Sequence, residues 1–356
     1  MANPWNLLRQ NQKGIEMKVY KKQKREETIP HAFEKKVLER EMAKGAPRIQ
    51  DFYRTNAAKT ENLNLELLRR EMKQEGKDIT TAFIKEETKL IPVKGHKIQV
   101  TIYKKQGSLK ERPGVLFIHG GGFFGGDVAA KGNQCRYLAE QSDAVIISPE
   151  YRLAPETPYP GALEDIMGTL DWMCLNAGNL GIDRDKIAIA GESAGGTLAV
   201  NCCLRDTERR IKLAMIIYGA LDLLPAEKTK YHWDYSKYEM YPQQKDYIMN
   251  RLFRFKELTE SIESLYIPDG YSAESGEISP VYAEDVSRMP KTVMIEAEFD
   301  YFKISNEEFV KKLQKSGKDV EVILYEGLDH GFFDRLGSLE QTADCIEEMA
   351  ERMKQL

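Results

Sequence analysis

Short apolar runs and helix-forming stretches alternate along the sequence from Ile98 to the C-terminus. The apolar runs, each long enough for one buried strand, are IQVTIYKK (98–105), VLFIHG (115–120), AVIISPEY (144–151), KIAIAG (186–191), LAMIIYG (213–219), TVMIEAE (292–298) and VEVILYEG (320–327). This alternation predicts an α/β protein with a mostly parallel sheet and helices on both of its faces. In such a sheet, functional groups gather at the carboxyl ends of the strands.

Two segments depart from the alternation. Residues 1–90 are charged and helix-prone, with predicted helices in FEKKVLEREMAKG (33–45) and NLELLRREMKQEG (64–76) that each stop at a glycine. Residues 222–280 are rich in aromatic side chains and form a predicted insertion over the edge of the sheet. We therefore divide the chain into a helical N-terminal segment (1–90), a first part of the core (91–221), the insertion (222–280) and a second part of the core (281–356).

Charge and composition exclude several classes of protein. The net charge of −4 arises from 56 acidic and 52 basic residues, which argues against a nucleic-acid partner. The sequence has neither a signal peptide nor an apolar run of about 18 residues, so we expect a cytoplasmic protein without stable membrane insertion. Five cysteines without CxxC spacing predict neither a disulfide framework nor a metal site.

The pentapeptide Gly191-Glu192-Ser193-Ala194-Gly195 matches the pattern G-x-S-x-G. It lies between a predicted strand, KIAIA, and a predicted helix, GGTLAVNCCL, which is the context that a nucleophile elbow requires. The sharp turn exposes the serine oxygen above the sheet, and glycines leave room for close backbone packing. Ser193 is therefore the predicted nucleophile.

A serine nucleophile needs a base, and the base needs an orienting acid. Of the five histidines, His330 follows the strand VEVILYEG in a short loop, and the chain order serine, acid, histidine favours it over His119. Asp300 follows the strand TVMIEAE and precedes His330 by 30 residues, which is enough for one helix and the neighbouring strand. Glu298 is the alternative acid, but Asp300 alone falls at the loop.

A second glycine cluster, HGGGFFGGD (119–127), has two interpretations. It formally contains G-x-G-x-x-G after a strand, which is typical of a dinucleotide site. However, no helix is predicted to open at its third glycine. The alternative is a loop whose consecutive backbone N–H groups hold a developing oxyanion, and the serine motif downstream favours it.

Taken together, these motifs resemble the hormone-sensitive-lipase-like branch of the α/β-hydrolase family, the esterases of the bacterial family IV type. The matching strings, in order, are HGGGF (119–123), YRLAPETPYPGALED (151–165), GESAGG (191–196), ISPVYAED (278–285), EAEFD (296–300) and DHGF (329–332). The resemblance implies a triad of Ser193, Asp300 and His330, and a helical cap formed by the N-terminal helices with the 222–280 insertion. It also implies oxyanion donors in the backbone N–H groups of Gly121, Gly122 and Ala194.

The sequence departs from the family pattern at three places. The family usually has aspartate at Glu192, histidine at Thr157, and a proline-leucine pair at Tyr301-Phe302. Because Glu192 adjoins Ser193 on a tight turn, we expect its side chain to diverge from the serine oxygen and to support the elbow.

We therefore predict a serine carboxylesterase that hydrolyses small esters, acetyl to butyryl, through an acyl-enzyme and without a cofactor. The partner is a small-molecule ester, and an edge strand of the sheet offers a way to form a homodimer. The aromatic residues of the insertion either enclose a small apolar pocket or only pack the cap. An amidase or peptidase on the same triad is the alternative, followed by a non-catalytic ligand-binding protein and a dinucleotide-dependent oxidoreductase.

Overall fold

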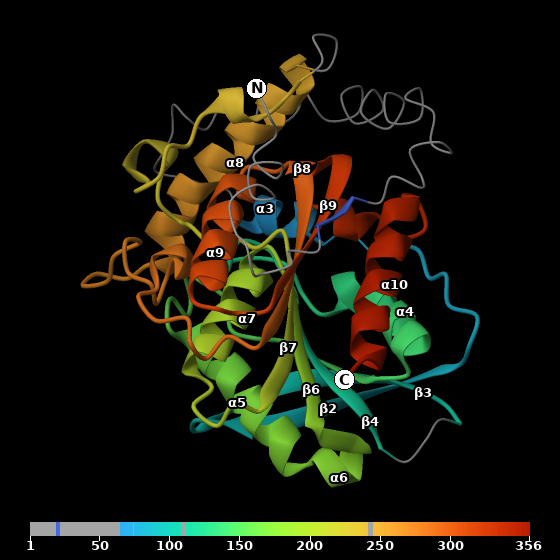
Figure 1. The fold of residues 1–356 in the computed structure, drawn as a ribbon. Coiled ribbons are helices and arrows are strands. Elements are labelled where there is room, and N and C mark those ends of the chain that lie inside the picture. Colours follow the sequence, from blue (N-terminus) through green and yellow to red (C-terminus); the bar gives the residue numbers. More distant parts are fainter. Residues whose placement is uncertain (1–18, 22–64, 74, 108–110, 241–244) are drawn as a thin grey trace.

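The central feature of the protein is a single sheet of nine strands in the part of the chain that its computed structural model describes, residues 19–21, 65–73, 75–107, 111–240 and 245–356 (Figure 1). The strands are β1 (Val19–Lys21), β2 (Ile84–Val93), β3 (His96–Lys105), β4 (Arg112–Ile118), β5 (Val145–Pro149), β6 (Ile182–Glu192), β7 (Ile211–Ile217), β8 (Lys291–Phe299) and β9 (Val320–Asp329). Their order across the sheet is β1-β9-β8-β7-β6-β4-β5-β3-β2. All seven predicted strands are present.

The sheet is parallel from β1 to β5, whereas β3 runs antiparallel to β5 and β2 antiparallel to β3. The inner parallel strands are buried on both faces, as their continuous apolar runs require. β1 pairs with β9 and takes the edge that β9 would otherwise present. The predicted mostly parallel sheet flanked by helices is confirmed.

Helices cover both faces of the sheet (Figure 1). They are α3 (Leu65–Glu71), α4 (Gly132–Ser142), α5 (Gly161–Leu175), α6 (Ala177–Leu180), α7 (Ala194–Arg205), α8 (Lys245–Tyr266), α9 (Lys303–Lys315) and α10 (Glu340–Lys354). One apolar core lies between the sheet and α5, α7 and α9, and a second lies between the sheet and the pair α4 and α10. None of the described helices combines the length and the apolar character that crossing a membrane requires.

The N-terminal region differs from the helical segment predicted for residues 1–90. The predicted helix at 33–45 lies outside the described residues, and the one at 64–76 corresponds to the shorter α3. β2 begins at Ile84, inside the predicted helical segment. Its first residues, IKEETK, are mostly exposed because β2 is an edge strand, so they lack the apolar signal of a strand.

Candidate active site

The candidate nucleophile Ser193 lies alone between the end of β6 and the start of α7. Its backbone has φ 54° and ψ −121°, a conformation that L-residues rarely adopt and that costs about 1–3 kcal/mol. The turn also requires its glycines. A Cβ atom on Gly191 would lie 2.2 Å from the carbonyl oxygen of Gly195, and one on Gly195 would lie 2.2 Å from that of Ile118.

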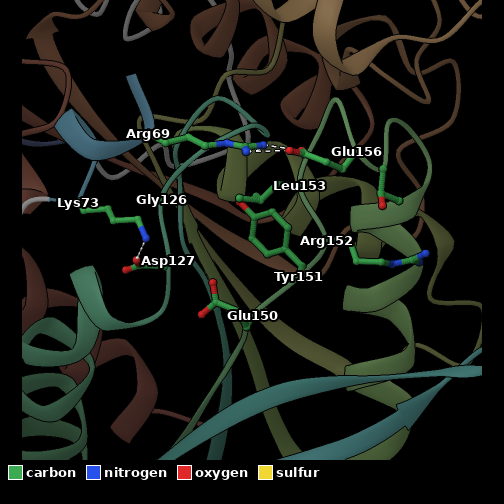
Figure 2. A pocket seen from close by; sticks show the side chains of 10 residues that line it. Arg69, Lys73, Gly126, Asp127, Glu150, Tyr151, Arg152, Leu153 and Glu156 are labelled. Atoms are coloured by element: carbon green, nitrogen blue, oxygen red, sulfur yellow. Dashed lines mark hydrogen bonds and ion pairs between the residues drawn. The ribbon is translucent and has the colours of Figure 1, made fainter. Parts of the chain in front are cut away.

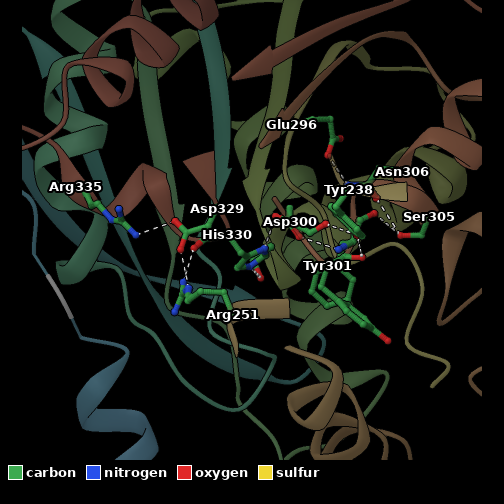
Figure 3. Close-up of polar contacts among 12 residues, drawn as sticks. Tyr238, Arg251, Glu296, Asp300, Tyr301, Ser305, Asn306, Asp329, His330 and Arg335 are labelled. Carbon is green, nitrogen blue, oxygen red and sulfur yellow. Dashed lines mark hydrogen bonds and ion pairs between the residues drawn. The ribbon is translucent and has the colours of Figure 1, made fainter. Parts of the chain in front are cut away.

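The structure brings Ser193, His330 and Asp300 into one hydrogen-bonded chain. The Ser193 Oγ lies 2.8 Å from His330 Nε2. His330 Nδ1 lies 2.6 Å from Asp300 Oδ2 (Figure 3). Asp300 is fully buried and His330 nearly so. With Nδ1 donating to the carboxylate, a neutral imidazole presents Nε2 as an acceptor for the serine hydroxyl. The arrangement can therefore remove a proton from Ser193.

Asp300 is fixed from two directions. Its Oδ1 accepts a hydrogen bond of 2.8 Å from the backbone N–H of Phe302, and its backbone carbonyl accepts one of 2.8 Å from the Tyr238 hydroxyl (Figure 3). The alternative acid, Glu298, instead accepts a bond of 2.7 Å from the backbone N–H of Gly327. The structure thus places Asp300, and not Glu298, against the histidine ring.

The loop after β4 makes a tight turn at two glycines. Gly121 and Gly122 adopt φ values of 118° and 61°, and the Gly121 carbonyl accepts bonds from the backbone N–H groups of Phe124 and Gly125. In the described part of the chain, the N–H groups of Gly121, Gly122 and Ala194 have no hydrogen-bond acceptor.

The structure does not support the interpretation of the same glycines as a dinucleotide site. A dinucleotide fold needs a helix that opens on the third glycine of the motif, Gly125. Here the next helix, α4, begins only at Gly132, after a short 3-10 turn at Ala129–Lys131.

Glu192 turns away from the serine and supports the loops around it. Its Oε1 accepts a hydrogen bond of 2.6 Å from the backbone N–H of Gly120 and lies 3.7 Å from Lys131 Nζ. Lys131 is also buried and lies 2.8 Å from Asp334, which follows His330 in the chain. The buried Lys131 ammonium thus joins the elbow, the glycine loop and the histidine loop.

These buried charges perturb one another. Burial raises the pKa of Glu192, and the nearby Lys131 ammonium opposes that rise. Burial alone would lower the pKa of Lys131, but Asp334 and Glu192 more than compensate and hold it above its ordinary value. Sequence reasoning missed this lysine because it carries no motif.

Aromatic side chains surround the His330 ring. The ring centroids of Phe255, Tyr218 and Phe302 lie 4.3, 4.6 and 5.5 Å from that of the imidazole. Phe255 belongs to α8, so the predicted insertion contributes directly to the surroundings of the histidine. Trp233, from the same segment, donates a hydrogen bond of 3.1 Å to the carbonyl of Tyr301, beside Asp300.

An open groove of about 460 Å³ lies beside the glycine loop, between α3 and residues 150–157 (Figure 2). Arg69 of α3 pairs with Glu156 at 2.5 Å and donates to the carbonyl of Phe124 at 2.6 Å. Lys73 pairs with Asp127 at 2.9 Å. Ser193 does not line this groove, so the groove is distinct from the hydrogen-bonded chain of Ser193, His330 and Asp300. The contacts tie α3 to the glycine loop.

The described residues contain no group of three or more histidine, cysteine, aspartate or glutamate side chains arranged to hold a metal ion. Two other histidines of the described residues make contacts of a different kind. His96 lies 2.8 Å from the buried Asp165, and His119 is fully buried against the ring of Tyr151. Burial lowers the pKa of His119 to about 4.

Comparison with known proteins identifies the family. Residues 115–334 match the family defined by the alpha/beta hydrolase fold, so the chain belongs to it. The chain is 29% identical over 225 residues to an arylesterase of Saccharolobus solfataricus, covering 61% of this chain and 67% of the relative. It is 31% identical over 286 residues to an arylacetamide deacetylase of Bos taurus, covering 66% of this chain and 72% of the relative.

A solved structure agrees with these relatives. The hyperthermophilic esterase of Pyrobaculum calidifontis superimposes with a TM-score of 0.69 at 26% identity, covering 87% of this chain and 97% of that one. The chain is thus an ester hydrolase of the hormone-sensitive-lipase-like branch, and the predicted enzyme class is confirmed.

Proposed function

We propose that the protein is a serine carboxylesterase that cleaves short-chain esters through an acyl-enzyme. The observation that carries this proposal is the hydrogen-bonded chain from Ser193 through His330 to the buried Asp300, with distances of 2.8 and 2.6 Å. Both distances are within the reach that proton transfer requires.

In the proposed reaction, His330 Nε2 takes the Ser193 proton as Oγ attacks the ester carbonyl carbon. Asp300 holds the imidazole in the required tautomer and stabilises the imidazolium that forms. The imidazolium then returns its proton to the leaving alcohol. Water, activated by the same histidine, attacks the acyl-enzyme and releases the acid. No step uses a cofactor or a metal.

The proposed oxyanion donors are the backbone N–H groups of Gly121, Gly122 and Ala194. Their support is that none of them has an acceptor within the described residues, and that Ala194 is the first residue of α7. Each donor contributes about 3 kcal/mol to stabilising the transition state in enzymes of this type.

We also propose that α3, from the 1–90 segment, and residues 222–280 form a cap over a core made of 91–221 and 281–356, whereas β1 and β2 join the core sheet. Two contacts support this division. Within the N-terminal segment, Arg69 of α3 binds the glycine loop, and within the insertion, Phe255 of α8 lies against His330. A cytoplasmic location and a homodimer stay predictions.

For the substrate, we propose acetyl to butyryl esters. Support comes from the aromatic rings that surround His330, and from the name of the bovine relative, which specifies an acetyl group. That name also specifies an amide, so hydrolysis of acetyl anilides is the second candidate activity.

The test is a series of p-nitrophenyl esters from acetate to palmitate, with p-nitroacetanilide beside them. We expect kcat/KM to peak at or below butyrate and Ser193→Ala to abolish turnover. Ser264→Ala, which changes an exposed serine, is the matched control and should retain full activity. Activity surviving in Ser193→Ala would refute the nucleophile, and a peak at palmitate would refute the substrate class.

A further inference from the structure

One face of α8 is fastened to the loop that carries His330. Arg251 Nε donates to Asp329 Oδ2 at 2.6 Å, and its Nη2 donates to the backbone carbonyl of His330 at 3.0 Å (Figure 3). Phe255 follows Arg251 by four residues, so the two side chains lie on the same face of the helix. The Phe255 ring lies 4.3 Å from the His330 imidazole.

Asp329 is the acceptor that makes this attachment specific. Its side chain is 5% exposed, and its second oxygen accepts a hydrogen bond of 2.9 Å from Arg335. Burial would raise the pKa of Asp329, but the guanidiniums of Arg251 and Arg335 lower it below its usual value. A buried carboxylate that stays ionised between two guanidiniums makes strong, directional hydrogen bonds.

We infer that Arg251 is a positioning residue for the proposed ester hydrolysis, which holds His330 in line with Ser193 by fastening its backbone to α8. This inference rests on the proposed function. Arg251 holds the main chain of residues 329–330 on one side, and the end of β9 holds it on the other. The backbone from which the His330 imidazole extends is therefore fixed in place. A displacement of about 1 Å in a catalytic group can cost about 100-fold in rate.

The inference makes the cap part of the catalytic apparatus. If α8 were displaced from the core, Arg251 would lose its hydrogen bonds to both residues of the loop, and Phe255 would lose its contact with the imidazole. The base is then aligned only while α8 is docked.

The experiment compares Arg251→Gln, Arg251→Lys and Asp329→Asn with Arg254→Gln. Arg254 lies on the same helix and makes no hydrogen bond or ion pair with the described residues, so it is the matched control. With p-nitrophenyl acetate, we expect Arg251→Gln to lower kcat about 30-fold and to leave KM within about 3-fold. Arg251→Lys, which retains the charge but not both bonds, should recover part of kcat, and Arg254→Gln should match wild type.

The double variant Arg251→Gln/Asp329→Asn tests whether the two residues affect kcat through the same contact. If the pair acts as one unit, the double variant loses no more kcat than the worse single variant. An unchanged kcat in folded Arg251→Gln, or losses that multiply in the double variant, would overturn the inference. If circular dichroism shows that Arg251→Gln does not fold, Arg251→Lys and Asp329→Asn test the inference in its place. A lowered kcat with a nearly unchanged KM would support it, and an unchanged kcat would overturn it.

The proposed function is tested separately in the same assays. A wild-type enzyme that turns over the ester and a Ser193→Ala variant that does not leave the proposed function intact, whatever Arg251→Gln does. A wild-type enzyme without ester hydrolysis overturns the function and this inference together.

Discussion

Replacing Lys131 by methionine tests the buried charges behind the elbow. Lys131 lies 2.8 Å from Asp334 and 3.7 Å from Glu192, and its side chain is 5% exposed. Methionine retains most of the apolar stem but removes the ammonium. Asp334 is 31% exposed, whereas Glu192 stays buried and loses the cation that favours its ionised form.

The expected cost follows from the geometry. Removing one partner of a buried ion pair costs about 3–5 kcal/mol, because the other charge stays in a medium of low dielectric. Glu192 keeps its hydrogen bond of 2.6 Å from the Gly120 N–H. We therefore expect Lys131→Met to lower the free energy of unfolding by about 3 kcal/mol, the lower end of this range. With an unfolding entropy of about 2.1 cal/mol/K per residue, a chain of this length should lose about 4 °C in Tm.

The loss should also depend on pH. Burial already raises the pKa of Glu192, and removing Lys131 raises it further. A carboxyl whose folded pKa lies above its unfolded value favours the folded state at low pH, and that advantage declines as pH rises towards the folded pKa. The deficit of Lys131→Met relative to wild type should therefore be larger at pH 8 than at pH 5.

The assay is urea unfolding followed by circular dichroism at pH 5, 6.5 and 8. Lys94→Met is the matched control, because Lys94 also pairs with a glutamate but is 66% exposed, and it should change stability by less than about 0.5 kcal/mol. We expect kcat to fall by less than about 10-fold, since the chain from Ser193 to Asp300 is untouched. Equal stability of Lys131→Met and Lys94→Met, or a deficit that grows towards pH 5, would refute the reasoning.

Three further predictions concern the elbow, the acid and a buried histidine. Asp300→Asn should lower kcat about 10⁴-fold with an unchanged Tm, since the amide favours the wrong tautomer of His330; a near-normal rate in the ester assay would exclude Asp300 as the acid. Gly195→Ala should give little folded protein by circular dichroism, because its Cβ would lie 2.2 Å from the carbonyl oxygen of Ile118; a normal Tm would show that the elbow can relax. His119, whose pKa burial lowers to about 4, takes up a proton in the unfolded chain before the folded one, so stability falls as pH drops from 7 to 4. Urea unfolding should show His119→Asn losing about 3 kcal/mol less than wild type over this range, and parallel pH profiles would contradict the lowered pKa.

The sequence was sufficient to predict seven of the nine strands of the described sheet, β3 to β9, and to select Ser193, Asp300 and His330. The runs VLFIHG, KIAIAG and TVMIEAE are continuously apolar because β4, β6 and β8 are buried on both faces. Such runs can be recognised in the sequence without knowledge of the fold. Ser193, Asp300 and His330 follow the carboxyl ends of strands, and neighbouring parallel strands bring those ends together.

Other features left no such signal. β2 carries exposed charged residues because it is an edge strand, so its pattern does not differ from that of a solvated helix. Lys131 and Arg251 belong to no motif, and their partners lie far away along the chain. Contacts of single long side chains depend on how distant segments pack, which local spacing does not encode.

The backbone of Ser193 sets stability and reactivity against each other. At φ 54° and ψ −121°, every residue with a Cβ atom is strained, and only glycine adopts this conformation without penalty. Replacing Ser193 with glycine would therefore relieve the strain but remove the hydroxyl group. A serine held in this strained conformation lowers the stability of the fold, and the proposed role of its hydroxyl in ester hydrolysis accounts for that cost.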